Sequence, residues 1–370
     1  MYGLHLHNSL DLKLTISQHE ETDMNKFNTI GVDLAKNVIQ VSVVSKNNKE
    51  LQNRELTRKR FAEFLAKQKP SLVAFEACAT AHYWSRVAIR HGHDAKIIPA
   101  KAITPFRQGH KTDKNDALAV AEAAKRPNIK IAPRKEIEQQ GMQAIQRSRE
   151  LLVHERTALS NHMRGLLLEF GEVIPQGFAA LTRRIPEILE DGENELAYIY
   201  RPTLSRLFER FVQLQDDIKF IEQQIKFYVK ENNPCYRLTA MEGVGPISAI
   251  LLFATLGTGE AFKNGREFSA YIGLTPKQYS SGGKANIIGI SKHVANRRLR
   301  AVLIQGARAY VYKMKEPKST KDKWLCSLIQ RAGYKRAAVA LANKNVRTAW
   351  ALLTEGTEYI KYHDNMQQAI

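Results

Sequence analysis

The chain has 370 residues, of which 44% are hydrophobic, so it can bury a substantial core and is long enough for two or three domains. Lys and Arg number 56 against 37 Asp and Glu, which gives a formal net charge of +19 and a pI near 9.7. No apolar run approaches the roughly 20 residues that cross a bilayer, and the N-terminus lacks a secretory pattern, so we expect neither a membrane protein nor an exported one.

Residues 1–24 are polar and weakly patterned, and they end in a second methionine, Met24. We expect a disordered extension here, or an over-long choice of start codon. Residues 361–370 are expected to form a tail.

The region 25–133 alternates strand and helix patterns. The expected strands are 27–36, 38–46, 51–57, 71–77 and 94–100, and the expected helices are 58–68, 81–92 and 113–126. Three consecutive strands followed by alternating helices and strands are typical of an α/β RNase H/RuvC-like fold. In that fold the first strand is central and the fourth lies beside it.

Four carboxylates in this region lie on the predicted strands and on one predicted helix. Asp33 lies in the first strand and Glu76 ends the fourth, while Asp113 and Asp116 are three residues apart and so share one helix face. Carboxylates gathered from two strands and a helix repel one another unless hard cations neutralise them. The sequence therefore predicts a site for two Mg²⁺ or Mn²⁺ ions that cuts nucleic acid by phosphoryl transfer.

The region 134–234 is expected to be a helical linker. Its second half has an apolar seam with alternating spacings of three and four residues: Leu204, Leu207, Phe211, Leu214, Ile218, Ile221, Ile225 and Tyr228. A helical hairpin within one chain and a dimerising coiled coil both explain this seam, and the pattern alone does not separate them.

The region 235–360 is expected to form a mostly α C-terminal domain. Gly243 and Gly245 belong to a Gly-Val-Gly-Pro turn between two helical runs, which resembles a helix-hairpin-helix whose backbone N–H groups hold a phosphate. A plain tight turn explains the same residues. Residues 261–350 hold 19 Lys and Arg against 3 Asp and Glu, a net +16, which is the charge pattern of a protein that binds a polyanion.

A Ser-Ser-Gly-Gly-Lys run lies in this basic region. Ser280 or Ser281 could act as a nucleophile, and the alternative is a Ser/Gly loop that touches phosphates without chemistry. The cations near it in sequence are candidates for phosphate binding: Lys284, Lys292, Arg297, Arg298 and Arg300.

Taken together, these strings resemble a transposase of the insertion-sequence-110 type, over residues 28 to 355 and in the family's order. GVDLAKN, VAFEA and KTDKNDA resemble its N-terminal DEDD motifs. AMEGVGPISAILLFATLG, FSAYIGLTPKQYSSGGK, GISKHVANRRLR and AAVALANKNVRTAWALL resemble its C-terminal transposase domain. The SSGGK loop and the basic tail look more like the insertion-sequence-1111 branch.

The resemblance implies roles for particular residues. Asp33, Glu76, Asp113 and Asp116 would bind divalent metal, and Ser280 would form a covalent phosphoserine link to DNA, with Ser281 as the alternative. The family also implies a structured guide RNA that pairs with donor and target DNA, and homo-oligomers such as a dimer or a dimer of dimers. The protein would act in the cytoplasm of a prokaryote, at the nucleoid.

Two rival functions remain at this point. A RuvC-type Holliday-junction resolvase would use water as its nucleophile and would leave the last 130 or so residues unexplained. A nucleic-acid-binding protein with a degenerate nuclease fold would need no catalytic residues, although all four acidic positions are filled.

Overall fold

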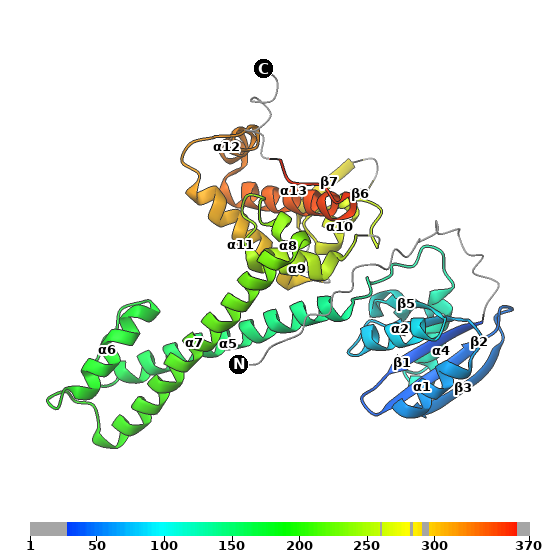
Figure 1. The fold of residues 1–370 in the computed structure, drawn as a ribbon, viewed down its shortest axis with the longest axis horizontal. Coiled ribbons are helices and arrows are strands. Elements are labelled where there is room, and N and C mark those ends of the chain that lie inside the picture. The colour runs from blue at the N-terminus through cyan, green and yellow to red at the C-terminus, as the bar shows by residue number, and fades with distance from the viewer. Residues whose placement is uncertain (1–27, 260, 282–283, 291–295, 361–370) are drawn as a thin grey trace. The chain divides into compact units, whose positions relative to one another are not determined.

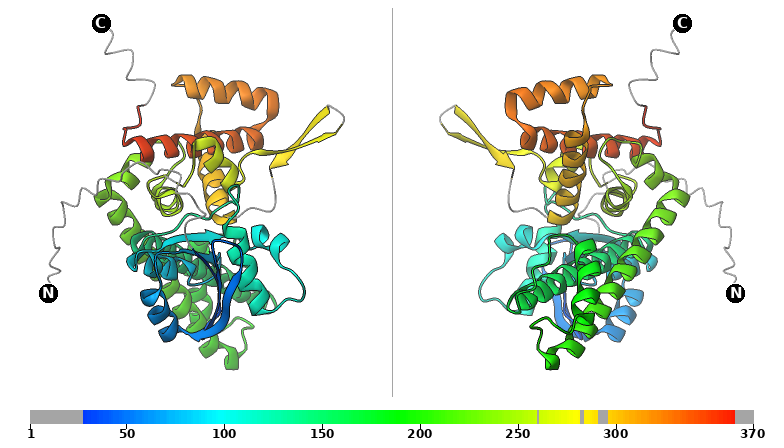
Figure 2. Two further views of the ribbon diagram at one scale, coloured as in Figure 1. Left: turned by 90° about the vertical axis from the view of Figure 1, so that its right-hand side faces the viewer. Right: turned by 90° about the vertical axis from the view of Figure 1, so that its left-hand side faces the viewer.

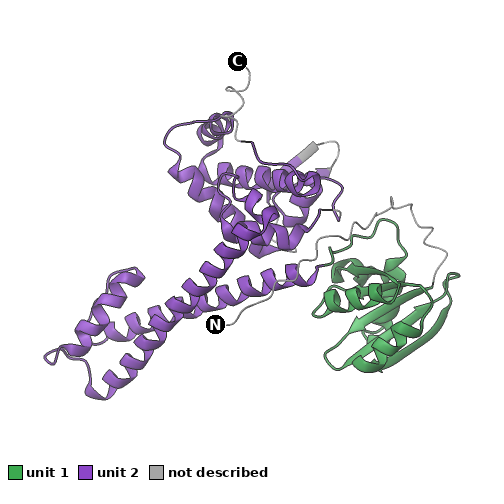
Figure 3. Cartoon of the chain, viewed as in Figure 1, with its two compact units in different colours: residues 1–134 green, residues 135–370 purple. Residues whose placement is uncertain are grey.

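A computed structural model describes residues 28–259, 261–281, 284–290 and 296–360 of the chain. The predicted N-terminal extension and C-terminal tail lie outside these residues. The described chain divides into two compact units, residues 1–134 and 135–370 (Figure 3). The predicted helical linker and C-terminal domain both fall in the second unit.

The first unit is built on one mixed five-stranded sheet (Figure 1). In spatial order its strands are β3 (Glu50–Thr57), β2 (Val38–Val44), β1 (Thr29–Leu34), β4 (Leu72–Glu76) and β5 (Asp94–Ile98). The first three strands are antiparallel neighbours, and β1, β4 and β5 run parallel. The predicted element order is confirmed, and the mixed sheet fits an RNase H-like fold with β1 at its centre.

Helices cover both faces of the sheet. The helices of this unit are α1 (Arg58–Lys67), α2 (Ala81–Arg90), α3 (Ala100–Ile103), the short η1 (Thr104–Phe106) and α4 (Asp113–Ala124). Helices α1 and α2 pack on the face that carries Ile30 and Val32, and α4 packs on the face that carries Leu72 and Ala74. Successive strand side chains point to opposite faces, so Asp33 and Glu76 lie on the α4 side.

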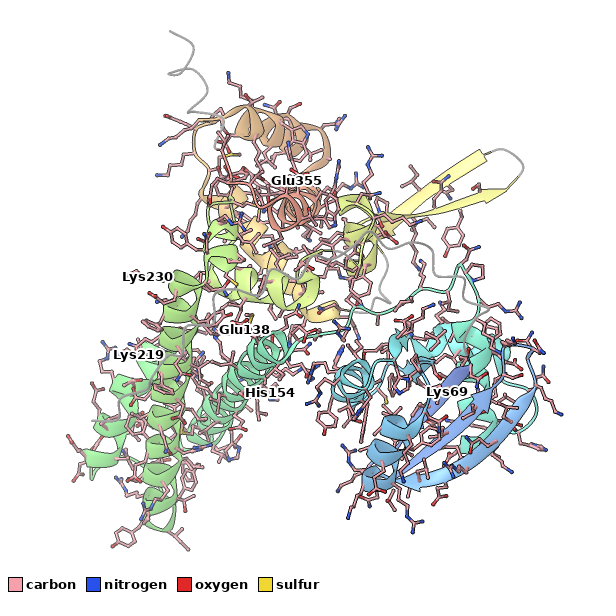
Figure 4. All side chains as sticks on the ribbon, turned by 45° about the vertical axis from the view of Figure 1, so that its right-hand side comes forward. Lys69, Glu138, His154, Lys219, Lys230 and Glu355 are labelled. Carbon is pink, nitrogen blue, oxygen red and sulfur yellow. The ribbon has the colours of Figure 1, made fainter. Side chains whose placement is uncertain are left out.

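The second unit begins with two long helices that run side by side (Figures 1 and 4). They are α5 (Ile137–Leu168) and α7 (Arg201–Glu231), and α6 (Phe178–Glu190) and the short η2 (Tyr198–Tyr200) lie between them in sequence. Five seam positions of α7 are buried: Leu204, Phe211, Leu214, Ile218 and Ile225. The seam packs within the chain, because a cluster that contains Leu204 and Phe211 also holds Met163 of α5 and Leu181 of α6.

A helical body follows in the same unit and shares one apolar core. Its helices are α8 (Asn233–Leu238), α9 (Pro246–Leu256), α10 (Gly265–Ile272), α11 (Arg297–Lys313), α12 (Thr320–Ala332) and α13 (Tyr334–Glu355). Side chains cap the N-termini of several of them, among them Asn264, Asn296 and Ser319. In the part of the chain that the structure describes, no helix is long and apolar enough to cross a membrane.

A β-hairpin projects from this helical body (Figure 2). Its strands are β6 (Pro276–Ser281) and β7 (Lys284–Ile290), paired antiparallel. Ser280 and Ser281 belong to β6, so the predicted Ser/Gly loop is wrong for these two residues. The strands were not predicted, because serines and glycines obscure a short strand pattern.

Candidate active site

The carboxylate site depends on a close contact between β1 and α4. A Cβ atom at Gly31 would lie 2.1 Å from the Ala117 backbone oxygen and 2.5 Å from the Ala121 backbone nitrogen. No side chain larger than hydrogen fits there, so the glycine between Ile30 and Val32 lets the helix lie directly on the strand. The first turn of α4 is thereby placed toward the carboxyl end of β1.

All four predicted carboxylates meet at this end of the sheet. Asp33 lies two residues after Gly31, and Glu76 ends β4, whose Phe75 pairs with Val32 of β1. Asp113 and Asp116 both lie in the first turn of α4. The structure thus brings together residues that are up to 83 positions apart in the sequence.

The electrostatics of Asp33 report this proximity. The pKa of Asp33 is raised from 3.8 to about 6, first by burial and then by the charges of Asp113, Glu76 and Asp116, in that order. The backbone N–H of Leu34 opposes the shift. Four carboxylates that repel one another around a half-buried strand end form an excess of negative charge that a cation would relieve.

The donor set suits a hard divalent cation, because it consists of carboxylate oxygens. Among the described residues, no three acidic, His or Cys side chains are already arranged to hold a metal ion. Asp113 is exposed and Glu76 is half-buried, so small side-chain rotations are open to both. The chemistry of the site therefore fits a divalent metal, although its side chains are not set in a coordinating arrangement.

Arg107 contacts one of the four carboxylates. Its Nη1 donates to Asp116 Oδ1 at 3.0 Å, and the two side chains are 29% and 15% exposed. The sequence analysis missed this residue, because Arg107 lies in the segment before α4 and no local motif marks it. The guanidinium occupies an oxygen that a metal ion would also use.

A chain of polar side chains supports the first turn of α4. Gln40, which pairs with Asp33 across β1 and β2, donates to Asn53 Oδ1 at 2.6 Å, and Asn53 Nδ2 donates to the Lys114 carbonyl at 3.1 Å. Thr112 caps the helix by accepting from the Asn115 N–H. These bonds fix the position of the two aspartates that begin the helix.

Cys78 lies near the same carboxylates but does not resemble a nucleophile. Burial, followed by the charges of Glu76 and Asp33, raises the pKa of its thiol to about 11. The thiol is therefore protonated near neutral pH.

The two candidate nucleophiles lie in the second unit. Ser280 is exposed near the end of β6 and pairs with Ala285 of β7, and Ser281 pairs with Lys284. Gly282 and Gly283, between the strands, lie outside the described residues. The hairpin presents Ser280 to solvent on a two-stranded arm rather than in a packed pocket.

The Gly-Val-Gly-Pro turn connects α8 and α9 and packs against α11. A Cβ at Gly243, which has a φ of +77°, would lie 2.8 Å from the Gly306 backbone oxygen. Gly245 immediately precedes α9 and has nothing within 4 Å of its Cβ position. The first glycine serves a helix contact, whereas the second leaves the helix N-terminus open.

The predicted phosphate-binding cations have different surroundings. Arg298 forms an ion pair with Glu150 of α5, and Arg300 donates to the Gly273 carbonyl at 3.4 Å. Arg297 is exposed at the start of α11. Lys292 and the side chain of Lys284 lie outside what the structure describes. Two of the five cations thus make contacts within the chain.

The chain matches two family models. Residues 30–171 match the DEDD model of the IS110 type, described as a transposase, and residues 235–323 match the model described as transposase, IS116/IS110/IS902 family.

Three relatives from bacteria are similar over nearly their whole length. A probable family 20 transposase of Pseudomonas aeruginosa is 40% identical over 331 residues, which cover 89% of this chain and 98% of the relative. The transposase for insertion sequence element IS1111A of Coxiella burnetii is 36% identical over 94% of this chain and 95% of its own. The transposase for insertion sequence element IS1328 of Yersinia enterocolitica is 36% identical over 90% of this chain and 98% of its own.

Proposed function

The chain belongs to the IS116/IS110/IS902 family of insertion-sequence transposases, and from that membership we propose a metal-dependent serine mechanism for its reaction on DNA. The family makes it a DNA recombinase, and its DEDD domain implies dependence on a divalent metal. The observation that supports the metal site is the placement of Asp33 and Glu76 near the carboxyl ends of two paired parallel strands, beside the first turn of α4 with Asp113 and Asp116.

Asp33, Glu76, Asp113 and Asp116 would hold Mg²⁺ or Mn²⁺, as a pair of ions. When bound, the ions supply positive charge that polarises the scissile phosphate. Asp33 belongs to the central strand, and the Thr112 cap holds the helix turn that carries the other two aspartates. The protein therefore contributes a cluster of negative charge at the carboxyl ends of β1 and β4. Arg107 would release Asp116 Oδ1 as a cation arrives.

The Ser280 hydroxyl would attack the scissile phosphorus. A bond forms between the serine oxygen and phosphorus, the bond from phosphorus to the 3′ oxygen breaks, and the serine proton is transferred so that the strand leaves as a 3′-hydroxyl. A 3′-hydroxyl from the partner duplex then attacks the phosphoserine, which rejoins the strands and restores the serine. Exposure of Ser280 near the end of β6 supports this role, and Ser281 is the alternative.

The partners follow from the same family. The protein would bind donor and target DNA together with a structured guide RNA, as a dimer or a dimer of dimers. The net charge of +16 in residues 261–350 favours binding of these polyanionic nucleic acids. The open N-terminus of α9 at Gly245 would contact a phosphate in the manner of a helix-hairpin-helix, and the α5 and α7 pair would act as a spacer.

The test is detection of the covalent intermediate. We would express the full chain with the DNA that flanks its own gene, purify it with any RNA that accompanies it, and react it with labelled DNA carrying the element end and Mg²⁺. Denaturing gels should show a protein–DNA adduct for the wild type and for Ser281→Ala, and none for Ser280→Ala or Asp33→Asn.

Other results would overturn parts of the proposal. Cleavage without any adduct would indicate water as the nucleophile, as in a junction resolvase. An adduct lost only in Ser281→Ala would move the nucleophile by one residue. Recombination that persists at a normal rate in both serine variants would exclude the serine mechanism.

A further inference from the structure

A large groove of about 1480 Å³ opens in the second unit, and neither candidate serine is among the residues that line it. The hairpin forms one side through Ile287, Ile288, Gly289 and Ile290 of β7. Helices α10, α12 and α13 form the other sides, with Trp324 and Leu328 from α12. Figure 2 shows the hairpin projecting from the helical body.

The helix α13 has two distinct faces. Ala337, Leu341 and Val346 belong to the apolar core of the unit and are fully buried. Arg336, Val339, Asn343 and Arg347 recur at spacings of three and four residues, and they line the groove instead. Val339 also packs against the core, so the groove face contributes one apolar side chain to it, whereas Arg336 and Arg347 are exposed.

Hydrogen bonds and a close backbone contact hold α13 against α10 and the segment around it, which together form one wall of the groove. Asn343 Nδ2 donates to Ser269 Oγ at 2.8 Å and to the Leu274 carbonyl at 3.2 Å. Trp350 Nε1 donates to the Phe262 carbonyl at 3.2 Å. A Cβ at Gly265 would lie 2.8 Å from the Arg347 backbone oxygen, so α10 and α13 touch directly.

The groove combines apolar surface with charge of one sign. Ile287 and Ile288 are 70% and 50% exposed, and Trp324 is 36% exposed. Five exposed cations line the groove: Arg266, Lys335, Arg336, Lys344 and Arg347. Its lining within the described residues includes no Asp or Glu. Its occupant should therefore carry repeated negative charge and flat apolar groups.

We propose that this groove binds an unpaired strand of DNA, with bases against the Trp324 and isoleucine surface and phosphates at the five cations. A duplex keeps its bases stacked inside, so its phosphates would contact the cations while the apolar surface of the groove stayed exposed to solvent. The proposal rests on the proposed function, because strand exchange on DNA exposes unpaired bases.

The reaction of the family favours DNA over RNA as the occupant. A transposase acts on DNA, and strand exchange between duplexes leaves DNA strands unpaired.

The experiment measures binding by fluorescence anisotropy with the full chain and labelled dT20, rU20 and a 20-base-pair duplex. Trp324→Leu keeps apolar bulk but removes the indole face, and it should lower dT20 affinity about tenfold. Lys335→Ala combined with Arg336→Ala should do the same. Trp324→Leu should leave duplex affinity within about threefold, because a duplex does not offer its bases to the indole.

The matched control removes two exposed cations of α12 that do not line the groove, as Lys323→Ala with Arg331→Ala. This variant should leave dT20 affinity within about threefold, and thermal melting of every variant should match the wild type. Photocrosslinking of 5-iodouracil-substituted dT20 should give adducts in residues 320–355.

Three outcomes would overturn the inference. An equal loss of duplex affinity in Trp324→Leu would make the groove a general basic surface, and unchanged dT20 affinity would exclude it as a DNA site. Tighter binding of rU20, with the same loss in Trp324→Leu, would assign the groove to RNA. Adduct formation by Ser280 is scored separately, so failure of this proposal is distinguishable from failure of the serine mechanism.

Discussion

Ionised Asp33 is held in an unfavourable place by burial and by three neighbouring carboxylates. Its folded pKa of about 6 lies above its ordinary value of 3.8. Its contribution to stability is therefore fully present below pH 3.8 and is lost as the pH rises through 6. The cluster that suits a cation thus weakens the metal-free fold at neutral pH.

The first prediction concerns the free energy of unfolding that is lost when Asp33 ionises. Asp33→Asn should stabilise the metal-free protein at pH 7.5 by about 1 kcal/mol, after allowance for the partial exposure of the group, and should change it little at pH 4. Thermal melting in EDTA at the two pH values measures the difference. The control is Glu63→Gln, an exposed carboxylate of α1. Equal shifts in melting temperature at both pH values would show that the ionisation of Asp33 does not destabilise the fold.

A second residue-scale prediction concerns Arg107. Its guanidinium occupies Asp116 Oδ1, so Arg107→Ala should remove a competitor for the cation and raise Mg²⁺ affinity about fivefold. Arg107→Lys should keep most of the wild-type value. The midpoint of a Mg²⁺ titration followed by melting temperature measures the affinity. A weaker affinity in Arg107→Ala would mean that the arginine positions Asp116 for the metal.

At the scale of elements, the contact of α4 with β1 determines whether the carboxylates meet. Gly31 allows the helix to lie on the strand, and the Gln40 and Asn53 bonds hold its first turn. Neither device involves a carboxylate. The site is therefore sensitive to substitutions that leave every proposed metal ligand in place.

The third prediction follows from that sensitivity. Gly31→Ala should cost about 3 kcal/mol of unfolding free energy, because its Cβ would overlap the α4 backbone, and it should abolish the Mg²⁺-dependent rise in melting temperature. Denaturant unfolding measures the loss. Gly141→Ala is the control, since nothing lies within 4 Å of its Cβ position inside α5. That variant should be neutral or slightly stabilising. A Gly31→Ala protein with wild-type stability would disprove the close helix contact.

At the scale of the whole molecule, charge is distributed very unevenly along the chain. Residues 261–350 contribute +16 of the total +19, while the first unit concentrates carboxylates at its sheet edge. Both units are nevertheless positive overall, because residues 1–134 hold 22 Lys and Arg against 13 Asp and Glu and residues 135–370 hold 34 against 24. We therefore expect both units to attract nucleic acid, with the positive charge of the second unit concentrated in residues 261–350.

The fourth prediction is a steep salt dependence. Affinity of the full chain for duplex DNA should fall by about a thousandfold or more between 50 and 200 mM KCl, because counterions are released at several phosphate contacts. Fluorescence anisotropy measures it, with sucrose of equal osmolality as the control for the solvent. A flat response would remove the role assigned to residues 261–350.

The positions of the four carboxylates could be predicted because strand and helix periodicities are local. Asp33 and Glu76 end apolar strands, and the spacing of Asp113 and Asp116 places them on one helix turn. Parallel neighbouring strands bring their carboxyl ends to the same end of a sheet, so the proximity of Asp33 and Glu76 could be predicted, whereas the contact of α4 with β1 depends on long-range packing. The basic character of residues 261–350 was equally plain from composition.

Other features depend on contacts between residues far apart in the sequence, which no local pattern encodes. The pairing of Arg298 with Glu150 spans 148 positions and turns a predicted phosphate ligand into a helix contact. The α7 seam packs against its own chain because α5 runs beside it. By itself, the sequence identified the candidate carboxylates and the basic segment, through local periodicity and charge. Only the tertiary structure decided which of them meet, and it alone assembled the groove, because packing of β7, α10, α12 and α13 is a long-range outcome.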